Sequence, residues 1–171
     1  MKHIFPLAAL FVLASCTPPS DAGHSSSNGV FTRNCETAMA LIQDFDNEDL
    51  SAVKAHFADS AVWLPTALGM TDTANLGDKV ERWEKAWAEY DFNLASEEVR
   101  LLPGVNSETK QADGSVRVYF DWDLVRSATD SSEEKTVTVA YYESWDFNAD
   151  GKIWLTQVYG DETAAMAALN E

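Results

Sequence analysis

Glu143 is the residue of this 171-residue sequence best placed for acid–base chemistry. It alternates in phase with the apolar residues of a predicted strand over 136–147, which are Val139, Tyr141, Trp145 and Phe147. Side chains at every second position of a strand point to the same face, so we expect Glu143 to point inward. A carboxyl group in apolar surroundings has a raised pKa and can serve as a general acid or base.

The next predicted strand, over 153–159, carries two more polar candidates. Gln157 and Tyr159 share the parity of Ile153 and Leu155, so we expect both on the inward face. Tyr159 is a second candidate catalytic residue, because a tyrosine hydroxyl can stabilise a developing oxyanion while a carboxylate moves a proton.

Other placements of the Glu143 carboxylate remain open. It would be hydrated at the mouth of a pocket, or it would be paired with Arg100 or Arg126. Tyr141 is an alternative to Tyr159 as the oxyanion donor. The aspartates Asp121 and Asp123 form a second carboxylate pair, but they alternate onto the polar face, where such groups are usually solvated.

Metal chemistry finds little support in the sequence. Residues 146–153 copy the first eight positions of a calcium-binding loop, but Gln157 stands where a bidentate glutamate is needed. Asn, Asp and Gly at these positions equally favour a tight hairpin turn. His56 is the one histidine beyond position 24, which excludes a zinc site built on histidines. We expect no metal and no cofactor.

Six tryptophans are many for a domain of this size. Helical and strand spacing assigns most of them to the core, whereas Trp63 and Trp154 are free to line a pocket mouth or a dimer face. The candidate ligand-binding residues are Trp63, Trp87, Tyr141 and Gln157.

The elements that must position these residues follow from apolar spacing. Helical spacing covers 35–45, begins again after a break and cap within 46–49, is clearest over 76–90, and returns after a cap at Asp161. Alternation predicts strands over 61–64, 92–102, 116–124, 136–147 and 153–159. Pro103 and Gly104 end the second of these. We therefore expect a single α+β domain with antiparallel strands.

This order of elements, with the segments 41–50, 57–63, 145–153 and 159–161, resembles the nuclear transport factor 2-like superfamily and its SnoaL-like group. The resemblance covers 33–170. It implies a cone-shaped, cystatin-like domain in which a curved antiparallel sheet wraps around a long helix, with a pocket at the open end and often a homodimer. The family includes isomerases, dehydratases, cyclases and ligand-binding proteins, and none of its catalytic constellations maps onto this chain residue by residue.

The first residues read as an export signal. A basic start and an apolar run over 4–14 precede Ser15 and Cys16. Residues 13–16 resemble the bacterial lipobox, which implies cleavage after residue 15 and lipidation of Cys16. We expect 16–32 to be the lipidated cysteine and a flexible linker, and 33–170 to be the folded domain. By resemblance to the enterobacterial sorting rule, the absence of Asp at position 17, which is Thr17, implies the outer membrane, facing the periplasm. Cys35 is then left as an unpaired, buried thiol.

The net charge of -16 excludes nucleic acids as partners, because such a surface repels phosphates. It also means that only the lipid on Cys16 can hold the chain to a membrane. We expect a lipid-anchored domain that binds a small apolar or amphipathic molecule. The alternatives are an isomerase or dehydratase using a pocket carboxylate, and a non-enzymatic dimerisation or protein-interaction module.

Overall fold

The structure is a computed structural model that describes residues 22–171, with side chains from residue 29 onward. The predicted signal sequence and Cys16 lie outside the described residues. The helices are α1 (Ala22–Asp46), α2 (Leu50–Ala55), α3 (Leu76–Trp87) and α4 (Glu162–Asn170). The strands are β1 (Phe57–Trp63), β2 (Ala74–Asn75), β3 (Asp91–Leu94), β4 (Arg100–Val105), β5 (Ala112–Arg126), β6 (Lys135–Phe147) and β7 (Ile153–Tyr159).

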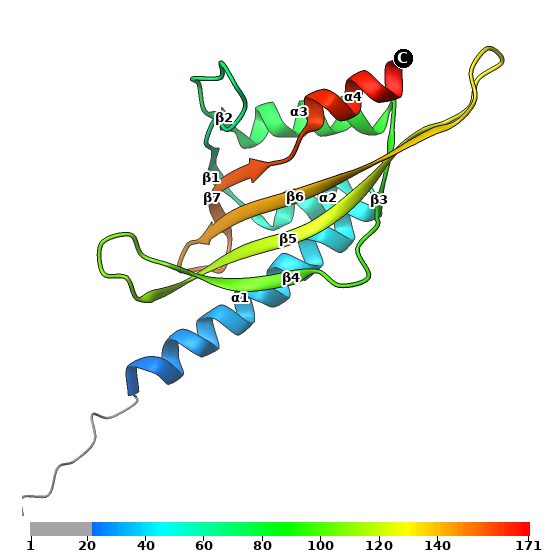
Figure 1. The fold of residues 1–171 in the computed structure, drawn as a ribbon. Helices are drawn as coiled ribbons and strands as arrows, with labels where there is room; N and C mark the ends of the chain where they lie inside the picture. The colour runs from blue at the N-terminus through cyan, green and yellow to red at the C-terminus, as the bar shows by residue number, and fades with distance from the viewer. Residues whose placement is uncertain (1–21) are drawn as a thin grey trace, which may run out of the picture.

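These strands form one curved, open sheet in the order β2-β1-β7-β6-β5-β3, with β4 also paired to β5. Neighbouring strands are antiparallel except β1 and β7, which run parallel. Figure 1 shows β5 and β6 as a long twisted hairpin through the sheet. The predicted α+β class and single domain are confirmed, and the expectation of a purely antiparallel sheet is wrong at the β1–β7 pair.

The strand predicted over 92–102 is wrong in its extent. The structure divides it into β3 and β4, which pair with successive parts of β5. In the gap the Ser96 hydroxyl accepts a hydrogen bond from the backbone N–H of Asp121 at 2.7 Å. β4 also continues through Pro103, which stands opposite Val116. An edge strand tolerates proline because its outer N–H has no partner strand to bond.

Helix α1 starts earlier than its apolar spacing indicates. We expected a helix over 35–45, but the helical backbone begins at Ala22 and includes part of the predicted linker. Contacts with the rest of the domain support this extension: Phe31 packs against the core, and the Asn34 side chain donates to the carbonyl oxygen of Gly114 at 2.8 Å. Tertiary contacts of this kind stabilise helical turns that composition alone does not favour.

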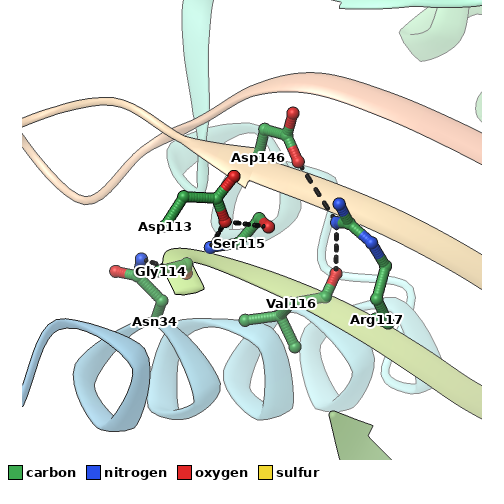
Figure 2. A network of polar contacts seen from close by, with 7 residues as sticks. All are labelled: Asn34, Asp113, Gly114, Ser115, Val116, Arg117 and Asp146. Carbon is green, nitrogen blue, oxygen red and sulfur yellow. Dashed lines mark hydrogen bonds and ion pairs between the residues drawn. The ribbon is translucent and has the colours of Figure 1, made fainter. Parts of the chain in front are cut away.

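Asn34 anchors α1 to the start of β5, as Figure 2 shows. Its side chain is buried, and Gly114 beside it has a φ of 83°, in the region that favours glycine. A β-carbon at Gly114 would lie 2.7 Å from Cγ1 of Val30 on α1. Nearby, Arg117 of β5 pairs with Asp146 of β6 at 3.2 Å. The helix is thus fixed against the sheet at its N-terminal half.

Side chains cap each of the other helices, and the caps expected within 46–49 and at Asp161 are confirmed. The Asp49 carboxylate accepts from the backbone N–H of Ala52 at 3.0 Å and starts α2. Asn75 and Asp78 form a reciprocal capping box at the start of α3, which ends at Trp87 rather than residue 90. Asp161 caps α4 as predicted, accepting from the N–H of Ala164 at 3.2 Å.

The core lies between the inner face of the sheet and the helices. Strand β5 contributes alternate buried side chains, namely Val116, Val118, Phe120, Trp122 and Leu124. Helix α1 covers this face with Ala38, Leu41 and Ile42, and α4 adds Ala165 and Leu169. The strand alternation predicted for β5 and β6 is confirmed. In the part of the chain that is described, no helix is long and apolar enough to cross a membrane.

Candidate functional site

A cavity of about 230 Å³ lies between α3 and the inner face of the sheet. Its wall is mostly aromatic and aliphatic, with four charged side chains among the lining residues. Aromatic members are Phe45, Phe57, Trp63, Trp83, Phe92, Phe120, Trp122, Tyr141 and Trp145, and charged members are Lys79, Arg82, Glu143 and Glu162. Mostly apolar concave sites with a few polar groups are typical of small-molecule binding.

Glu143 lines this cavity from β6, as its alternation with apolar neighbours predicts. Its Oε2 accepts a hydrogen bond from the indole N–H of Trp145 at 2.8 Å. Burial raises the pKa of Glu143 to about 7, an effect that the Trp145 hydrogen bond and the positive charge of Lys79 only partly offset. A carboxyl group with this pKa exchanges its proton near neutral pH.

A second carboxylate reaches the cavity from the start of α4. The Tyr141 hydroxyl donates to Oε1 of Glu162 at 3.2 Å. Burial, followed by the negative charges of Glu162 and Glu143, raises the pKa of Tyr141, so the phenol keeps its proton. Glu143 and Tyr141 lie two residues apart on the same strand face, which places a proton-exchanging group next to a hydrogen-bond donor.

The two arginines considered as partners of Glu143 lie elsewhere. The Arg100 guanidinium is 5.1 Å from the centre of the Tyr119 ring, on the opposite face of the sheet. Arg126 donates to Oδ1 of Asn170 at 3.2 Å. Neither therefore neutralises the Glu143 carboxylate, and the positive charge that acts on it is that of Lys79.

The inward orientation expected for Gln157 and Tyr159 is wrong. The register between β6 and β7 shifts: Phe147 pairs with Ile153, whereas Asp146, the residue before Phe147, pairs with Leu155 and leaves Trp154 as an extra residue in β7. This bulge reverses which positions of β7 face the core. Inward positions are then Thr156, which is 1% exposed, and Val158, which lines the cavity.

Tyr159 consequently stands outside the aromatic cavity. It is 46% exposed, and its ring lies 5.8 Å from that of Tyr142. The Gln157 amide faces its hydroxyl at 3.5 Å, and Gln157 does not line the cavity. Tyr141 is therefore the tyrosine that the structure places with Glu143.

The two tryptophans predicted to contact a ligand have different positions. Trp63 lines the cavity, with its ring 5.9 Å from that of Trp83. Trp87 is not among the lining residues; it packs against Phe45 at 4.9 Å, and its indole N–H is buried without a hydrogen-bond partner among the described residues. Trp83, whose helical spacing predicts a core position, packs against the core and also lines the cavity.

The remaining candidates have structural positions. The Asn148 side chain accepts from the backbone N–H groups of Asp150 and Lys152, which forms the predicted hairpin turn. Within residues 29–171 no cluster of three potential metal ligands occurs. Asp123 accepts from the Thr138 hydroxyl, and Asp121 lies near that of Ser96.

His56 and Cys35 lie apart from the cavity as well. The His56 ring nitrogen is 2.6 Å from the Asp44 carboxylate, so α1 holds the end of α2. Cys35 is half-buried, and burial raises the pKa of its thiol. A raised pKa disfavours the reactive thiolate.

Three charged residues of the cavity escaped the sequence analysis. Lys79 and Arg82 lie on α3, and Glu162 begins α4. The signal for Lys79 was present, because it precedes Trp83 by one helical turn and so shares its face. Nothing in the local sequence places Glu162 beside Tyr141, since that contact depends on how α4 folds back.

Comparison of sequences finds no matching protein-family model and no matching curated protein. Solved structures do match. A candidate SnoaL-like polyketide cyclase of Shewanella denitrificans aligns with a TM-score of 0.57 and 8% identity, over 80% of this chain and 95% of its own. An LEH-like epoxide hydrolase of M. tuberculosis aligns with a TM-score of 0.54 and 20% identity, over 81% of this chain and 90% of its own.

A third similar structure is an NTF2-like protein of Burkholderia xenovorans, with a TM-score of 0.57 and 14% identity over 81% of this chain and 96% of that one. In each comparison the alignment spans at least 90% of the solved structure's own chain. At these identities the likeness concerns the fold. The chain therefore has the nuclear transport factor 2-like fold of the SnoaL-like proteins.

Proposed function

We propose that this domain binds a small, mostly apolar molecule in the cavity between α3 and the sheet. The observation that carries the proposal is the cavity itself, whose aromatic wall surrounds a few charged groups. Burial of apolar ligand surface against such a wall contributes about 25 cal/mol for each Å² removed from water. The polar groups at one side then favour a ligand with one polar end.

Native mass spectrometry of the protein purified from its producing cells tests this proposal. We expect a co-purified small molecule that dissociates on unfolding. Ala86 lines the cavity, so Ala86→Phe should reduce the amount of bound molecule, whereas Ala88→Phe at the exposed C-cap just after the same helix should not. An unliganded protein that also binds no apolar compound would refute the proposal.

A second candidate function is proton transfer on a bound carbonyl compound, as in an isomerase or lyase. The specific observation in its favour is Glu143, which lies in the cavity with a pKa of about 7 and with the Tyr141 hydroxyl on the same face. Glu143 would remove a proton next to the carbonyl, and the Tyr141 hydroxyl would stabilise the resulting enolate. The similar structures include proteins named as a polyketide cyclase and an epoxide hydrolase, so this fold occurs in proteins named as enzymes.

Exchange of the α-protons of cyclohexanone in D₂O, followed by NMR, separates binding from catalysis. A catalytic Glu143 predicts exchange above the buffer rate that increases as the pH rises through about 7 and is lost in Glu143→Gln. Equal exchange in the wild type and in this variant would leave binding as the function.

We further propose that a lipid on Cys16 holds the domain to the outer membrane, on the periplasmic side. The export signal and the lipobox-like residues 13–16 support this anchor. The net charge of -16 supports it indirectly, because such a domain has no electrostatic attraction to anionic headgroups. A homodimer is compatible with this arrangement.

A further inference from the structure

We propose that the ligand is an amphipathic carboxylate whose acidic head binds next to Lys79 and Arg82, where the aromatic cavity meets a second cavity. This inference rests on the proposed binding function and adds the chemical class of the ligand. The apolar body of the ligand occupies the aromatic cavity, and the head lies at the junction.

The second cavity has a volume of about 330 Å³ and is lined in part by the loop over 64–72. Five residues line both cavities and so mark their junction: Trp63, Lys79, Arg82, Val158 and Glu162. Together the cavities reach the range of about 300–1,000 Å³ that is usual for ligand sites. An elongated molecule therefore fits this site better than a compact one.

Lys79 and Arg82 present two positive charges at this junction. They lie three residues apart on α3, so their side chains share one helical face. Neither forms an ion pair or hydrogen bond within the described part of the chain, although the protein has 28 acidic residues and only 12 basic ones. The Lys79 ammonium instead lies 6.0 Å and 5.7 Å from the ring centres of Trp63 and Trp83.

The two glutamates of the cavity do not satisfy these cations. Glu143 accepts from the Trp145 indole, and Glu162 accepts from the Tyr141 hydroxyl. Burial lowers the pKa of Lys79, and the attraction of Glu162 and Glu143 compensates this only in part. Neither glutamate, nor any other carboxylate of the described residues, lies within ion-pair distance of the ammonium. A ligand carboxylate would supply a close counter-charge through charge-assisted hydrogen bonds to Lys79 and Arg82.

Three ligands of equal chain length test the charge of the head group: octanoate, 1-octanol and octylamine. Each is titrated into the full-length chain made by cell-free synthesis, which attaches no lipid to Cys16, and binding is followed by calorimetry. We expect octanoate to bind about tenfold more tightly than 1-octanol. The octanoate carboxylate accepts charge-assisted hydrogen bonds from Lys79 and Arg82, whereas the neutral hydroxyl of 1-octanol forms a weaker hydrogen bond there. Octylamine should bind most weakly.

The variant carrying Lys79→Met and Arg82→Met should lose the preference for octanoate over 1-octanol, so that the two ligands bind it with similar affinity. Lys85→Met is the matched control, because Lys85 lies on the same helix and lines neither cavity. If wild-type protein binds octanoate and 1-octanol equally, or octylamine most tightly, the inference is overturned while the binding function stands. Binding of none of the three would overturn both.

Discussion

The indole N–H of Trp145 donates to the carboxylate of Glu143 at 2.8 Å, across two residues of one strand. This bond holds the carboxylate toward the aromatic cavity, where burial raises its pKa to about 7. The positive charge of Lys79 favours the ionised form, and the negative charge of Glu162 disfavours it. The group is therefore poised between its two protonation states near neutral pH.

Replacing Glu143 by Gln should change how stability depends on pH. Unfolded Glu143 releases its proton near pH 4.5 and the native residue near pH 7, so the free energy of unfolding falls as pH rises between these values. Glu143→Gln removes this loss and can still accept from Trp145. Above pH 7 it should be more stable than the wild type by about 1–3 kcal/mol. Urea unfolding at pH 5 and pH 8 measures this difference. An equal decrease in the free energy of unfolding of the wild type and of Glu143→Gln between these pH values would contradict the prediction. Glu84→Gln, at an exposed position, serves as the control.

Gly160 is required by the ring of Tyr141. A β-carbon at this position would lie 2.8 Å from Cε1 and 2.9 Å from Cδ1 of Tyr141. Gly160→Ala should therefore displace the ring and cost about 1–3 kcal/mol of stability in a denaturant titration. Gly29→Ala, whose β-carbon would meet nothing within 4 Å, should cost nothing. Equal stability of both variants would show that the ring is free to move.

Asn34 should be needed to keep α1 on the sheet. Asn34→Leu removes the donor to the Gly114 carbonyl and leaves that buried oxygen without this partner. We expect a loss of about 1–3 kcal/mol by thermal or urea unfolding. The exposed neighbour Glu36→Leu should change stability by much less. An unchanged midpoint for Asn34→Leu would mean that apolar packing alone fixes the helix.

The lipid anchor predicts that Cys16→Ser moves the protein out of the membrane fraction. Cys16→Ser should abolish lipidation, and mass spectrometry of the N-terminal peptide of the membrane-bound wild type should show acyl chains on Cys16. Cys35→Ser should leave the protein in the membrane fraction. Wild-type protein found without acyl chains, or released intact by salt, would contradict the anchor.

Alternation and helical spacing predicted correctly the elements in which the repeat of apolar residues is unbroken. The inward position of Glu143 follows from the unbroken alternation of β6, and the hairpin turn follows from Asn148 and Gly151. Alternation misplaced Gln157 and Tyr159, because one bulge in β7 reverses the facing of every later residue. A bulge of this kind depends on pairing between strands and leaves no clear mark in the local sequence.

Features that depend on distant contacts were also missed. Glu162 meets Tyr141 because α4 returns over the sheet, and β3 separates from β4 where Ser96 bonds to Asp121. Lys79 is different: its spacing from Trp83 already placed it on the inner face of α3. Treating a lysine on an aromatic helical face as a candidate site residue would have identified it.

The most direct test of ligand binding in the aromatic cavity is calorimetric titration of 1-octanol into three proteins. These are the wild type, Ala86→Phe, which places a ring in the cavity, and Ala88→Phe, which places one at the exposed C-cap of α3. The account predicts saturable binding with one site in the wild type and in Ala88→Phe, and little or none in Ala86→Phe. Equal binding by all three proteins, or none by any, would contradict it.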